Sequence, residues 1–375
     1  DAKNKFNMKK KVRYSYLPQQ FNNCPELWKN LKKFVKSGDF TLGKELKIFE
    51  RNFAKLIGTK YACGVNSGTD AIKLSLKVLN VKAGDEVITA ANTFVATIGA
   101  ITEIGAKPVF VDCDDTFCMN VNQLESKITK KTKAIVPVHF TGYMVNMIKL
   151  AKIGKKYKIP IVEDACQSIL GSINNRNAGS WGEFGAFSLH PLKNINVWSD
   201  GGIITTNNKK FYNKLLLLRN HGLVDRDTVK ISGYNSRLDT FQAVVGNWLL
   251  PKAHSIANQR IKNAKYLDKK FEKIEGISIP PRPKNYKIVF HLYVVFAKQR
   301  NKLLNYCLSK GIEAKVHYPK PMYLQESLKK LKHKWGDFPT TDEHTQKIIT
   351  FPCDQHLNKS QLNYIVKTVN DFYNK

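Results

Sequence analysis

Between residues 61 and 207, short apolar runs alternate with stretches of helical periodicity. The apolar runs predict seven strands, at Tyr61–Asn66, Asp85–Ala91, Pro108–Asp114, Ala134–Phe140, Pro160–Cys166, Glu183–His190 and Gly201–Asn207. In several of them apolar residues occupy consecutive positions, as expected when both faces of a mostly parallel sheet are covered. The intervening stretches predict helices at Thr69–Leu79, Thr93–Ile104, Val121–Thr129, Met144–Lys158 and Lys209–Arg219. This alternation predicts an α/β lobe.

The flanking segments follow a different pattern. Before the lobe, a helix is predicted at Pro25–Lys36. After it, a helical region at Leu238–Leu250 meets Pro251 and resumes to about residue 274, and a strand follows at Val289–Phe296. We expect a large domain at residues 41–250, a small C-terminal domain at residues 251–375, and an N-terminal segment, residues 1–40, that packs with the small lobe.

The composition sets the size and class of the protein. Its 375 residues, of which 42% are hydrophobic, allow a large core and two lobes. No run of about 18 apolar residues predicts a membrane span. The first residues, Asp1–Lys11, have no apolar h-region and look like a trimmed end rather than a signal peptide. We therefore expect a cytoplasmic protein.

The cysteines do not form a ligand cluster. There are seven, an odd number without a CxxC pair, and several lie within apolar strand patterns, so we expect reduced, buried thiols. Cys113 and Cys118 are the only close pair, and their spacing is poor for a zinc or iron–sulfur site. The sequence predicts no metal.

The net charge of +31 raises the question of nucleic-acid binding. Lysines are scattered over almost every predicted surface helix, for example Lys29, Lys32 and Lys36, instead of being concentrated in one tail or one recognition helix. This distribution favours lysine-rich solvated faces, and no nucleic-acid partner is expected. A positive field would still attract anionic substrates to a cleft.

A turn at Ser67-Gly68-Thr69-Asp70 joins the first predicted strand to a helix. Free N–H groups in the first helical turn, together with the helix dipole, favour a phosphate there, and Gly68 would let it approach the backbone. A plain N-cap by Ser67 or Thr69 explains the same residues.

A carboxylate follows the apolar run Ile161-Val162. Asp164 would lie at the carboxyl end of a parallel strand, where open α/β sheets bind ligands. A carboxylate beside a pyridine nitrogen favours the protonated ring, which then stabilises a developing carbanion. The alternative is an aspartate that caps the next turn.

A lysine stands in a distinctive loop after the sixth predicted strand, where Ser188-Leu189-His190-Pro191-Leu192-Lys193-Asn194 is followed by Asp200-Gly201-Gly202. A lysine amine can form a Schiff base with pyridoxal 5'-phosphate (PLP) and act as a base once the amino donor displaces it. Ser188 would hydrogen-bond the phosphate. A single lysine carries no weight in this chain, but Lys193 in this frame, together with Asp164, predicts a PLP enzyme.

Eight segments share their order and approximate spacing with a known family. They are Ser67–Ala71, Asp85–Ile88, Thr93–Thr97, Pro108–Asp112, Glu163–Gln167, Phe187–Lys193, Asn220–Gly222 and Asn235–Asp239. From about residue 15 to its end the chain resembles the DegT/DnrJ/EryC1/StrS family of PLP-dependent aminotransferases, which act mostly on nucleotide-linked keto sugars. The resemblance implies an α/β protein of PLP-dependent transferase fold type I, aspartate aminotransferase-like. Its large domain would hold a seven-stranded, mostly parallel sheet, and a smaller C-terminal α+β domain would follow.

The resemblance also implies which residues contact the cofactor ring. Lys193 would hold PLP covalently, Asp164 would pair with the pyridine nitrogen, and Gln167 would lie near the ring hydroxyl. Phe94 would stack on the ring face, although ordinary core packing also explains an aromatic residue there.

The phosphate would be held by residues of two subunits. Gly68, Thr69 and Ser188 would contact it from one chain and Asn235 from the neighbouring one, so the resemblance implies a homodimer with shared active sites.

Further residues are expected on the substrate side. Arg237 suits a carboxylate or phosphate, while a salt bridge with Asp239 is the alternative. The segment Val316–Pro321 matches the His-Tyr-Pro segment of the family, which lines the substrate side. The expected substrate-binding residues are Arg237, His190, His317, Tyr318 and Tyr323, and the histidines have a structural role as their alternative.

Three residues depart from the family pattern. Cys166 replaces a usual alanine, Tyr323 stands where many members have histidine, and Trp198 stands where smaller residues are common. A bulky Trp198 near the lysine loop is expected to narrow or reshape the sugar pocket.

The resemblance implies a ping-pong transfer of an amino group from L-glutamate to a keto sugar, for surface-polysaccharide, lipopolysaccharide or secondary-metabolite amino sugars. Lysine at position 193, where one subgroup has histidine, disfavours sugar dehydration. One alternative is a keto sugar without a nucleotide, such as an oxidised octulosonate or a keto inositol. The other is a non-catalytic regulatory or nucleic-acid-binding protein. Such a protein would be expected to have lost the lysine, the aspartate and the phosphate turn, all of which are present in this chain.

Overall fold

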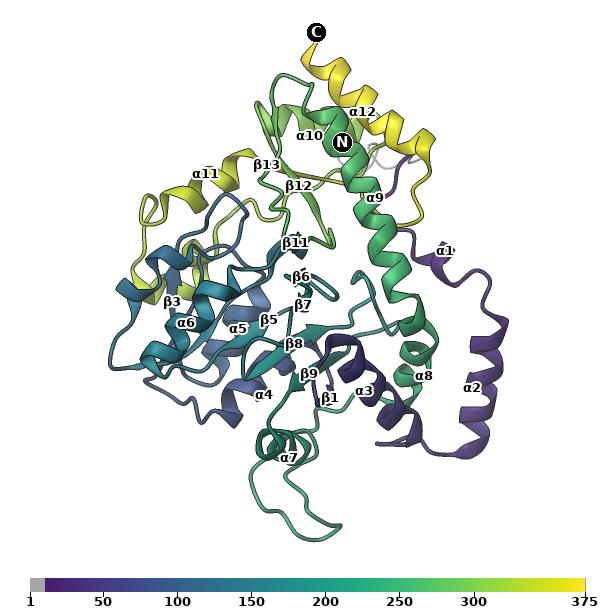
Figure 1. The fold of residues 1–375 in the computed structure, drawn as a ribbon, viewed down its shortest axis with the longest axis vertical. Helices are drawn as coiled ribbons and strands as arrows, with labels where there is room; N and C mark the ends of the chain where they lie inside the picture. The colour runs from purple at the N-terminus through teal and green to yellow at the C-terminus, as the bar shows by residue number, and fades with distance from the viewer. Residues whose placement is uncertain (1–10, 375) are drawn as a thin grey trace.

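Seven strands form the central layer of the structure, a computed structural model that describes residues 11–374 (Figure 1). A four-stranded sheet of order β1-β9-β8-β5 and a three-stranded sheet of order β3-β2-β4 are joined between β4 and β5 by the parallel bridges Ile135–Ile161 and Val138–Asp164. The strands are β1 (Tyr61–Val65), β2 (Glu86–Ala90), β3 (Lys107–Val111), β4 (Thr132–Val136), β5 (Val162–Asp164), β8 (Phe184–Ser188) and β9 (Gly202–Thr206).

Most neighbouring strands in this layer are parallel. β2 pairs in parallel with β3 and β4, and β5 with β8, whereas β9 runs antiparallel to both β1 and β8. The predicted seven-stranded, mostly parallel sheet is confirmed.

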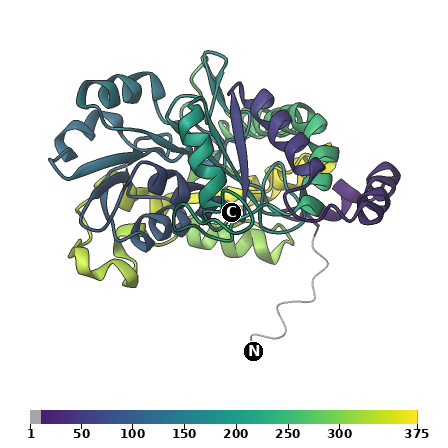
Figure 2. The ribbon, with the colours of Figure 1, turned by 90° about the horizontal axis from the view of Figure 1, so that it is seen from below.

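Helices cover both faces of the sheet, as the unbroken apolar runs predicted (Figure 2). Successive residues of a strand point to opposite faces, so Ile203 packs in one apolar core and Ile204 in the other. The helices of this region are α3 (Lys44–Ile57), α4 (Gly68–Val78), α5 (Val95–Glu103), α6 (Met147–Tyr157), α7 (Lys209–Leu218) and α8 (Thr240–Leu249).

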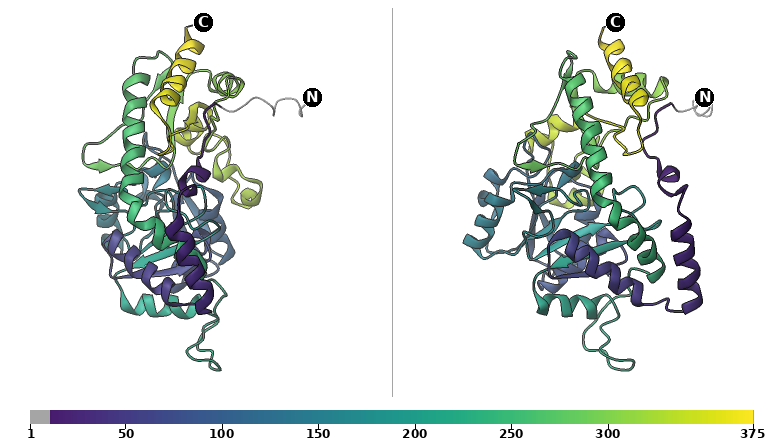
Figure 3. Two further views of the ribbon diagram at one scale, coloured as in Figure 1. Left: turned by 90° about the vertical axis from the view of Figure 1, so that its right-hand side faces the viewer. Right: turned by 45° about the vertical axis from the view of Figure 1, so that its right-hand side comes forward.

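The C-terminal region is built around the antiparallel sheet β10-β12-β13. The long helix α9 leads into it from α8, past the short turn that contains Pro251, and extends along the molecule in Figure 3. Its elements are α9 (Ala253–Phe271), β10 (Ile277–Ser278), β12 (Tyr293–Ala297), α10 (Arg300–Ser309), α11 (Pro339–Lys347), β13 (Ile348–Phe351) and α12 (Lys359–Tyr373). A further small sheet joins β11 (Tyr286–Lys287) to β6 (Ser172–Ile173) and β7 (Arg176–Asn177).

The N-terminal segment contacts two regions. Val12 forms a bridge with Ile312, which follows α10 in the C-terminal region. The helix α2 (Pro25–Ser37), which follows α1 (Leu17–Phe21), buries Leu27 and Phe34 against α8. The domain boundaries at residues 40 and 250 stay predictions, and the predicted absence of a signal peptide concerns residues outside the described range.

One predicted element is wrong, and another begins later than predicted. The predicted helix Val121–Thr129 consists of two short 3-10 turns, η2 (Val121–Gln123) and η3 (Glu125–Lys127), because the Asn120 side chain accepts from Asn122 N and Ile128 turns to an extended conformation. The predicted strand Val289–Phe296 is present as β12 but begins only at Tyr293, because the N–H groups of residues 289 and 292 donate to carbonyls of the 3-10 turn η4 (Phe140–Gly142) instead of a strand.

Within residues 11–374, no helix has both the length and the apolar composition that a bilayer span requires, and no cluster of three or more potential metal ligands is present.

Candidate active site

A cavity of about 310 Å³ opens at the edge of the sheet where β1, β2, β5 and β8 end. Carboxyl ends of parallel strands meet at one edge, so side chains far apart in sequence converge there. The predicted residues on the cavity wall are Gly68, Thr69, Phe94, Asp164, Gln167, Ser188, His190, Lys193, His317 and Tyr318.

The turn after β1 combines a helix cap with a close backbone approach. Ser67 caps α4 by accepting from Asp70 N at 3.1 Å, so the N-cap interpretation of Ser67 is confirmed. A Cβ at Gly68 would lie 2.8 Å from Ser188 Cβ and 2.9 Å from Cys166 Sγ, so only glycine fits here. Among the described residues the N–H groups of Gly68 and Thr69 have no partner, which leaves them available to an anion.

The Asp164 carboxylate is buried and fixed at the end of β5. Its Oδ2 accepts from the Thr97 hydroxyl at 2.7 Å, and its Oδ1 accepts from Cys166 N at 3.2 Å. The Thr93 and Thr97 hydroxyl oxygens are 2.7 Å apart. Since Thr97 donates its proton to the carboxylate, Thr93 is the donor to Thr97. A chain of two hydroxyls therefore orients the aspartate that the sequence identified.

Lys193 lies on a tight turn after β8. Its N–H donates to His190 O at 2.8 Å, and the Leu192 N–H donates to His190 Nδ1 at 3.2 Å, which holds the loop in shape. Burial lowers the pKa of the Lys193 ammonium, and the nearby Cys166 and Asp164 only partly oppose it. A lowered pKa gives the amine a larger uncharged fraction, which a nucleophile requires.

Gln167, Tyr318 and Phe94 form another part of the wall. Gln167 is buried, and its Oε1 accepts from Thr141 N at 2.7 Å. Burial raises the pKa of Tyr318. The Phe94 ring is 49% exposed and its centroid lies 5.9 Å from that of Tyr318, so Phe94 is not a core residue.

Two predicted residues lie outside this cavity. Asn235 pairs with Asn220, and Arg237 donates to Asn220 Oδ1 at 3.1 Å. Between them, the Ser236 hydroxyl donates to Asp70 Oδ2 at 2.6 Å, which ties this segment to the start of α4. No ion pair joins Arg237 to Asp239 in the described residues, because Asp239 caps α8.

Tyr323 and Trp198 also lie away from the cavity wall. Tyr323 is 1% exposed, donates to the Asp342 carboxylate and packs against Phe338. Trp198 packs against Phe21 and Phe241 and does not line this cavity, so its effect on the sugar pocket stays a prediction.

Several residues of the site were missed by the sequence analysis. Tyr14, His291 and Lys315 line the cavity, and Thr97 supports it by holding Asp164. A signal existed for Lys315, since it lies two residues before His317 and shares its face in an extended segment. Tyr14 and His291 reach the cavity through tertiary contacts that no local pattern shows.

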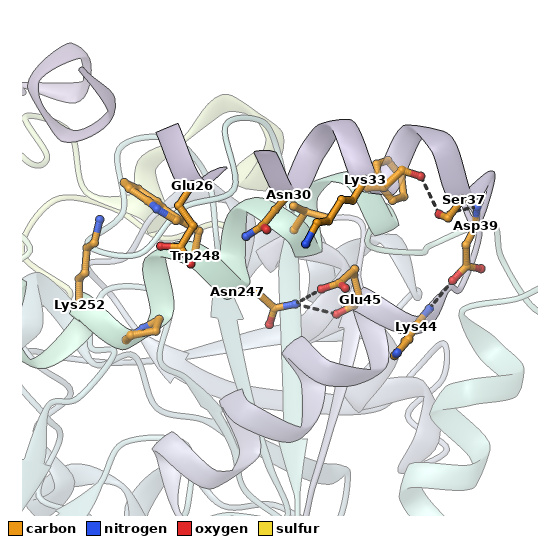
Figure 4. Close-up of a pocket in the computed structure, with 13 residues that line it drawn as sticks. Glu26, Asn30, Lys33, Ser37, Asp39, Lys44, Glu45, Asn247, Trp248 and Lys252 are labelled. Carbon is orange, nitrogen blue, oxygen red and sulfur yellow. Dashed lines mark hydrogen bonds between the residues drawn. The ribbon is translucent and has the colours of Figure 1, made fainter. Parts of the chain in front are cut away.

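Two larger cavities lack this chemistry, as does a third of about 490 Å³ that is lined by residues of α2 alone. One of about 620 Å³ lies beside α2, where Asn247 Nδ2 donates to the carbonyl and carboxylate oxygens of Glu45 and the Lys44 N–H donates to Asp39 (Figure 4). Another of about 730 Å³ is lined by residues of α10 and α11. Neither wall includes Lys193 or Asp164, so we assign the active site to the cavity at the sheet edge.

Comparison with known proteins identifies the family. The model of the DegT/DnrJ/EryC1/StrS aminotransferase family matches residues 24–370. The chain belongs to this family. It is therefore a PLP-dependent aminotransferase of fold type I, and the family match favours the enzyme over the non-catalytic alternative.

Individual relatives match over nearly the whole chain. A pleiotropic regulatory protein of Geobacillus stearothermophilus is 35% identical and covers 95% of this chain and 97% of its own. The UDP-N-acetyl-3-dehydro-alpha-D-glucosamine 3-aminotransferase of Acidithiobacillus ferrooxidans is 32% identical, over 92% of this chain and 93% of its own length. The crystal structure of S. venezuelae DesV in complex with a ketimine intermediate has a TM-score of 0.95 and 29% identity, and covers 98% of this chain and 100% of its own.

Proposed function

We propose that this aminotransferase moves an amino group from L-glutamate to a nucleotide-linked keto sugar in the cytoplasm. The A. ferrooxidans relative, whose name specifies a UDP-linked 3-dehydro sugar, supports the acceptor class. Glutamate as donor rests on the family resemblance. The observation that carries the catalytic part is the convergence of Lys193, Asp164 and the Gly68 turn on one cavity.

The residues present suit PLP. The Gly68 turn has no room for a side chain and offers two N–H groups that have no partner within residues 11–374, which suits the phosphate together with Thr69 and Ser188. The buried Asp164 carboxylate suits a protonated pyridine nitrogen. Lys193, with its lowered pKa, suits covalent attachment.

When bound, PLP supplies a conjugated ring that stabilises negative charge on the substrate carbon. In our proposal the Asp164 carboxylate would accept a hydrogen bond from the protonated ring nitrogen and keep it protonated, and Thr97, which donates to Asp164 Oδ2, orients the carboxylate. Lys193 Nζ, once released by the amino donor, would take the proton from the donor carbon and deliver the same proton to the cofactor. Phe94 would exclude water from one face of the ring, and Gln167 would orient the ring hydroxyl.

The lysine assignment is tested by the absorbance of the PLP-saturated protein before and after borohydride and after L-glutamate. We expect wild type that has been reduced with borohydride to keep PLP attached when it is denatured. In unreduced wild type, L-glutamate should bleach the absorbance of the bound PLP. Lys193→Ala should lose both properties, and mass spectrometry of the reduced wild type should place the adduct on residue 193. Lys210→Ala, a change on the surface helix α7, is the control and should match wild type. Retained adduct and turnover in Lys193→Ala would refute the assignment.

The acceptor is tested with a panel of keto sugars and glutamate. We expect ping-pong kinetics and amination of a UDP- or dTDP-linked keto sugar. Turnover limited to an oxidised octulosonate or a keto inositol would favour the alternative acceptor class.

We further propose a homodimer with shared sites. Asn235 and Arg237 lie outside the cavity of their own chain. The exposed apolar residues Trp28, Phe40 and Phe241 gather around Phe34 and Trp198, and a contiguous apolar patch of this kind is typical of an interaction surface. Mixing subunits of the inactive variants Lys193→Ala and Asn235→Ala should restore activity, because one site of the mixed dimer is intact. No recovery after verified subunit exchange would contradict shared sites.

A further inference from the structure

Lys315 presents a positive charge at the wall of the active-site cavity. Its backbone is fixed by a pair of hydrogen bonds with Thr350 of β13, at 3.0 and 2.8 Å. His317, two residues further along, also lines the cavity, and its Nδ1 lies 2.9 Å from Thr350 Oγ1. β13 therefore holds both residues at the cavity.

The Lys315 ammonium is oriented by an aromatic ring. Its Nζ lies 4.1 Å from the centroid of Tyr14, which also lines the cavity. Tyr14 is held in turn by its N–H, which donates to Glu313 Oε2 at 2.7 Å. A cation over an aromatic face loses less of its freedom when it binds a ligand than a lysine that moves freely in solvent.

Lys315 has no acidic partner within 4 Å in residues 11–374, and its side chain is exposed. The two aspartates on the cavity wall are placed differently. The Asp164 carboxylate is buried and accepts from Thr97 and Cys166 N, whereas Asp200 is exposed and its carbonyl accepts from Gln242. The ammonium of Lys315 is therefore available to an anion that enters the cavity.

Four other basic residues near the cavity, His317, His291, Lys193 and Arg237, do not offer this charge. Burial, with Lys315 and Lys193 nearby, lowers the pKa of His317 to about 4, and burial also lowers that of His291 well below its usual range. Both imidazoles are therefore uncharged at neutral pH. Lys193 is committed to the cofactor, and Arg237 is engaged by Asn220 outside the cavity.

We propose that Lys315 binds an anionic group, a carboxylate or a phosphate, of a substrate in this cavity and so sets the preference of the enzyme for acidic substrates. An ammonium pairs with such a group through short, charge-assisted hydrogen bonds. This inference rests on the proposed aminotransferase site. It adds an anion-binding residue that pairs with β13 of the C-terminal region and lies on the wall of that site.

The test compares Lys315→Met, which removes the charge and keeps the length, with Lys315→Arg, which keeps the charge. Lys302→Met, a change of an exposed lysine on α10 outside the cavity, is the matched control. Binding to the PLP-saturated enzyme is measured by calorimetry with two unreactive probes. Glutarate represents the carboxylates of the amino donor, and UDP represents the diphosphate of a nucleotide sugar.

We expect Lys315→Met to weaken binding of one probe about tenfold, Lys315→Arg to stay within about threefold of wild type, and Lys302→Met to match it. Added NaCl should weaken the binding of that probe to wild type, and should weaken its binding to Lys315→Met much less. Loss confined to glutarate assigns Lys315 to the amino donor, and loss confined to UDP assigns it to the acceptor.

Unchanged binding of both probes by a folded Lys315→Met would overturn the proposal, and Lys315→Gln repeats the test if the first variant does not fold. Failure of the proposed function has a different signature, since wild type would then bind the probes but transfer no amino group from glutamate.

Discussion

Glu163→Gln tests how the structure holds the strand that carries Asp164. The Glu163 side chain is fully buried next to Asp164 on β5, and its carboxylate accepts four hydrogen bonds. Oε2 accepts from His139 Nε2 at 2.9 Å and from Gly179 N at 2.8 Å. Oε1 accepts from Trp181 N at 2.7 Å and from the N–H of residue 182 at 2.8 Å.

The magnitude follows from these bonds. The Val145 N–H donates to His139 Nδ1 at 3.2 Å, so the proton of this imidazole is on Nε2 and points at Glu163. A glutamine has one acceptor oxygen, so in either orientation two of the four donors face an NH2 group. At about 1.5–3 kcal/mol for each charge-assisted bond, the loss is about 3–6 kcal/mol. Relief from burying a charge offsets part of this, so we expect about 3–5 kcal/mol.

The assay is urea unfolding of the PLP-saturated protein at matched concentration. Glu275→Gln is the control, because that exposed carboxylate has a single lysine partner at 3.4 Å and should change stability by less than about 1 kcal/mol. We also expect Glu163→Gln to bind PLP more weakly, since β5 and the loop of residues 179–182 are no longer tied together. A loss of less than about 1 kcal/mol, equal to that of Glu275→Gln, would refute this account of β5.

Two further predictions follow. Gly68→Ala should lose PLP affinity and about 1–3 kcal/mol of stability, because its Cβ would lie 2.8 Å from Ser188 Cβ. Gly99→Ala on α5 is the control: a Cβ there meets nothing within 4 Å, so this variant should be more stable than wild type by about 0.5–1 kcal/mol. PLP titration and urea unfolding check both variants, and equal behaviour would contradict the steric argument. The folded state lowers the pKa of His317 from 6.5 to about 4, so unfolded chains bind more protons between these values and stability should fall as pH drops from about 6.5 to about 4. The stability of His317→Gln, measured by unfolding at a series of pH values, should fall less steeply over this range than that of wild type. Parallel stability curves for the two proteins would show that His317 does not contribute.

The sequence by itself determined the sheet and the residues at its edge. Strand patterns with consecutive apolar residues predict a sheet covered on both faces, and Ile203 and Ile204 indeed pack in different cores. Asp164, Lys193 and the Gly68 turn could be found because each lies at the carboxyl end of a strand or within a few residues of it, and the carboxyl ends of parallel strands meet. Local patterns carry this information because strand direction and side-chain alternation follow from the backbone.

Only the tertiary structure decided which further groups reach the site. Tyr14 and Lys315 come from opposite ends of the chain and meet at 4.1 Å, and Thr97 reaches Asp164 across 67 positions of sequence. The structure also placed Tyr323 in an apolar cluster instead of the pocket. Such contacts depend on how the lobes pack, and packing is set by the shape of whole surfaces instead of by the pattern of any one segment.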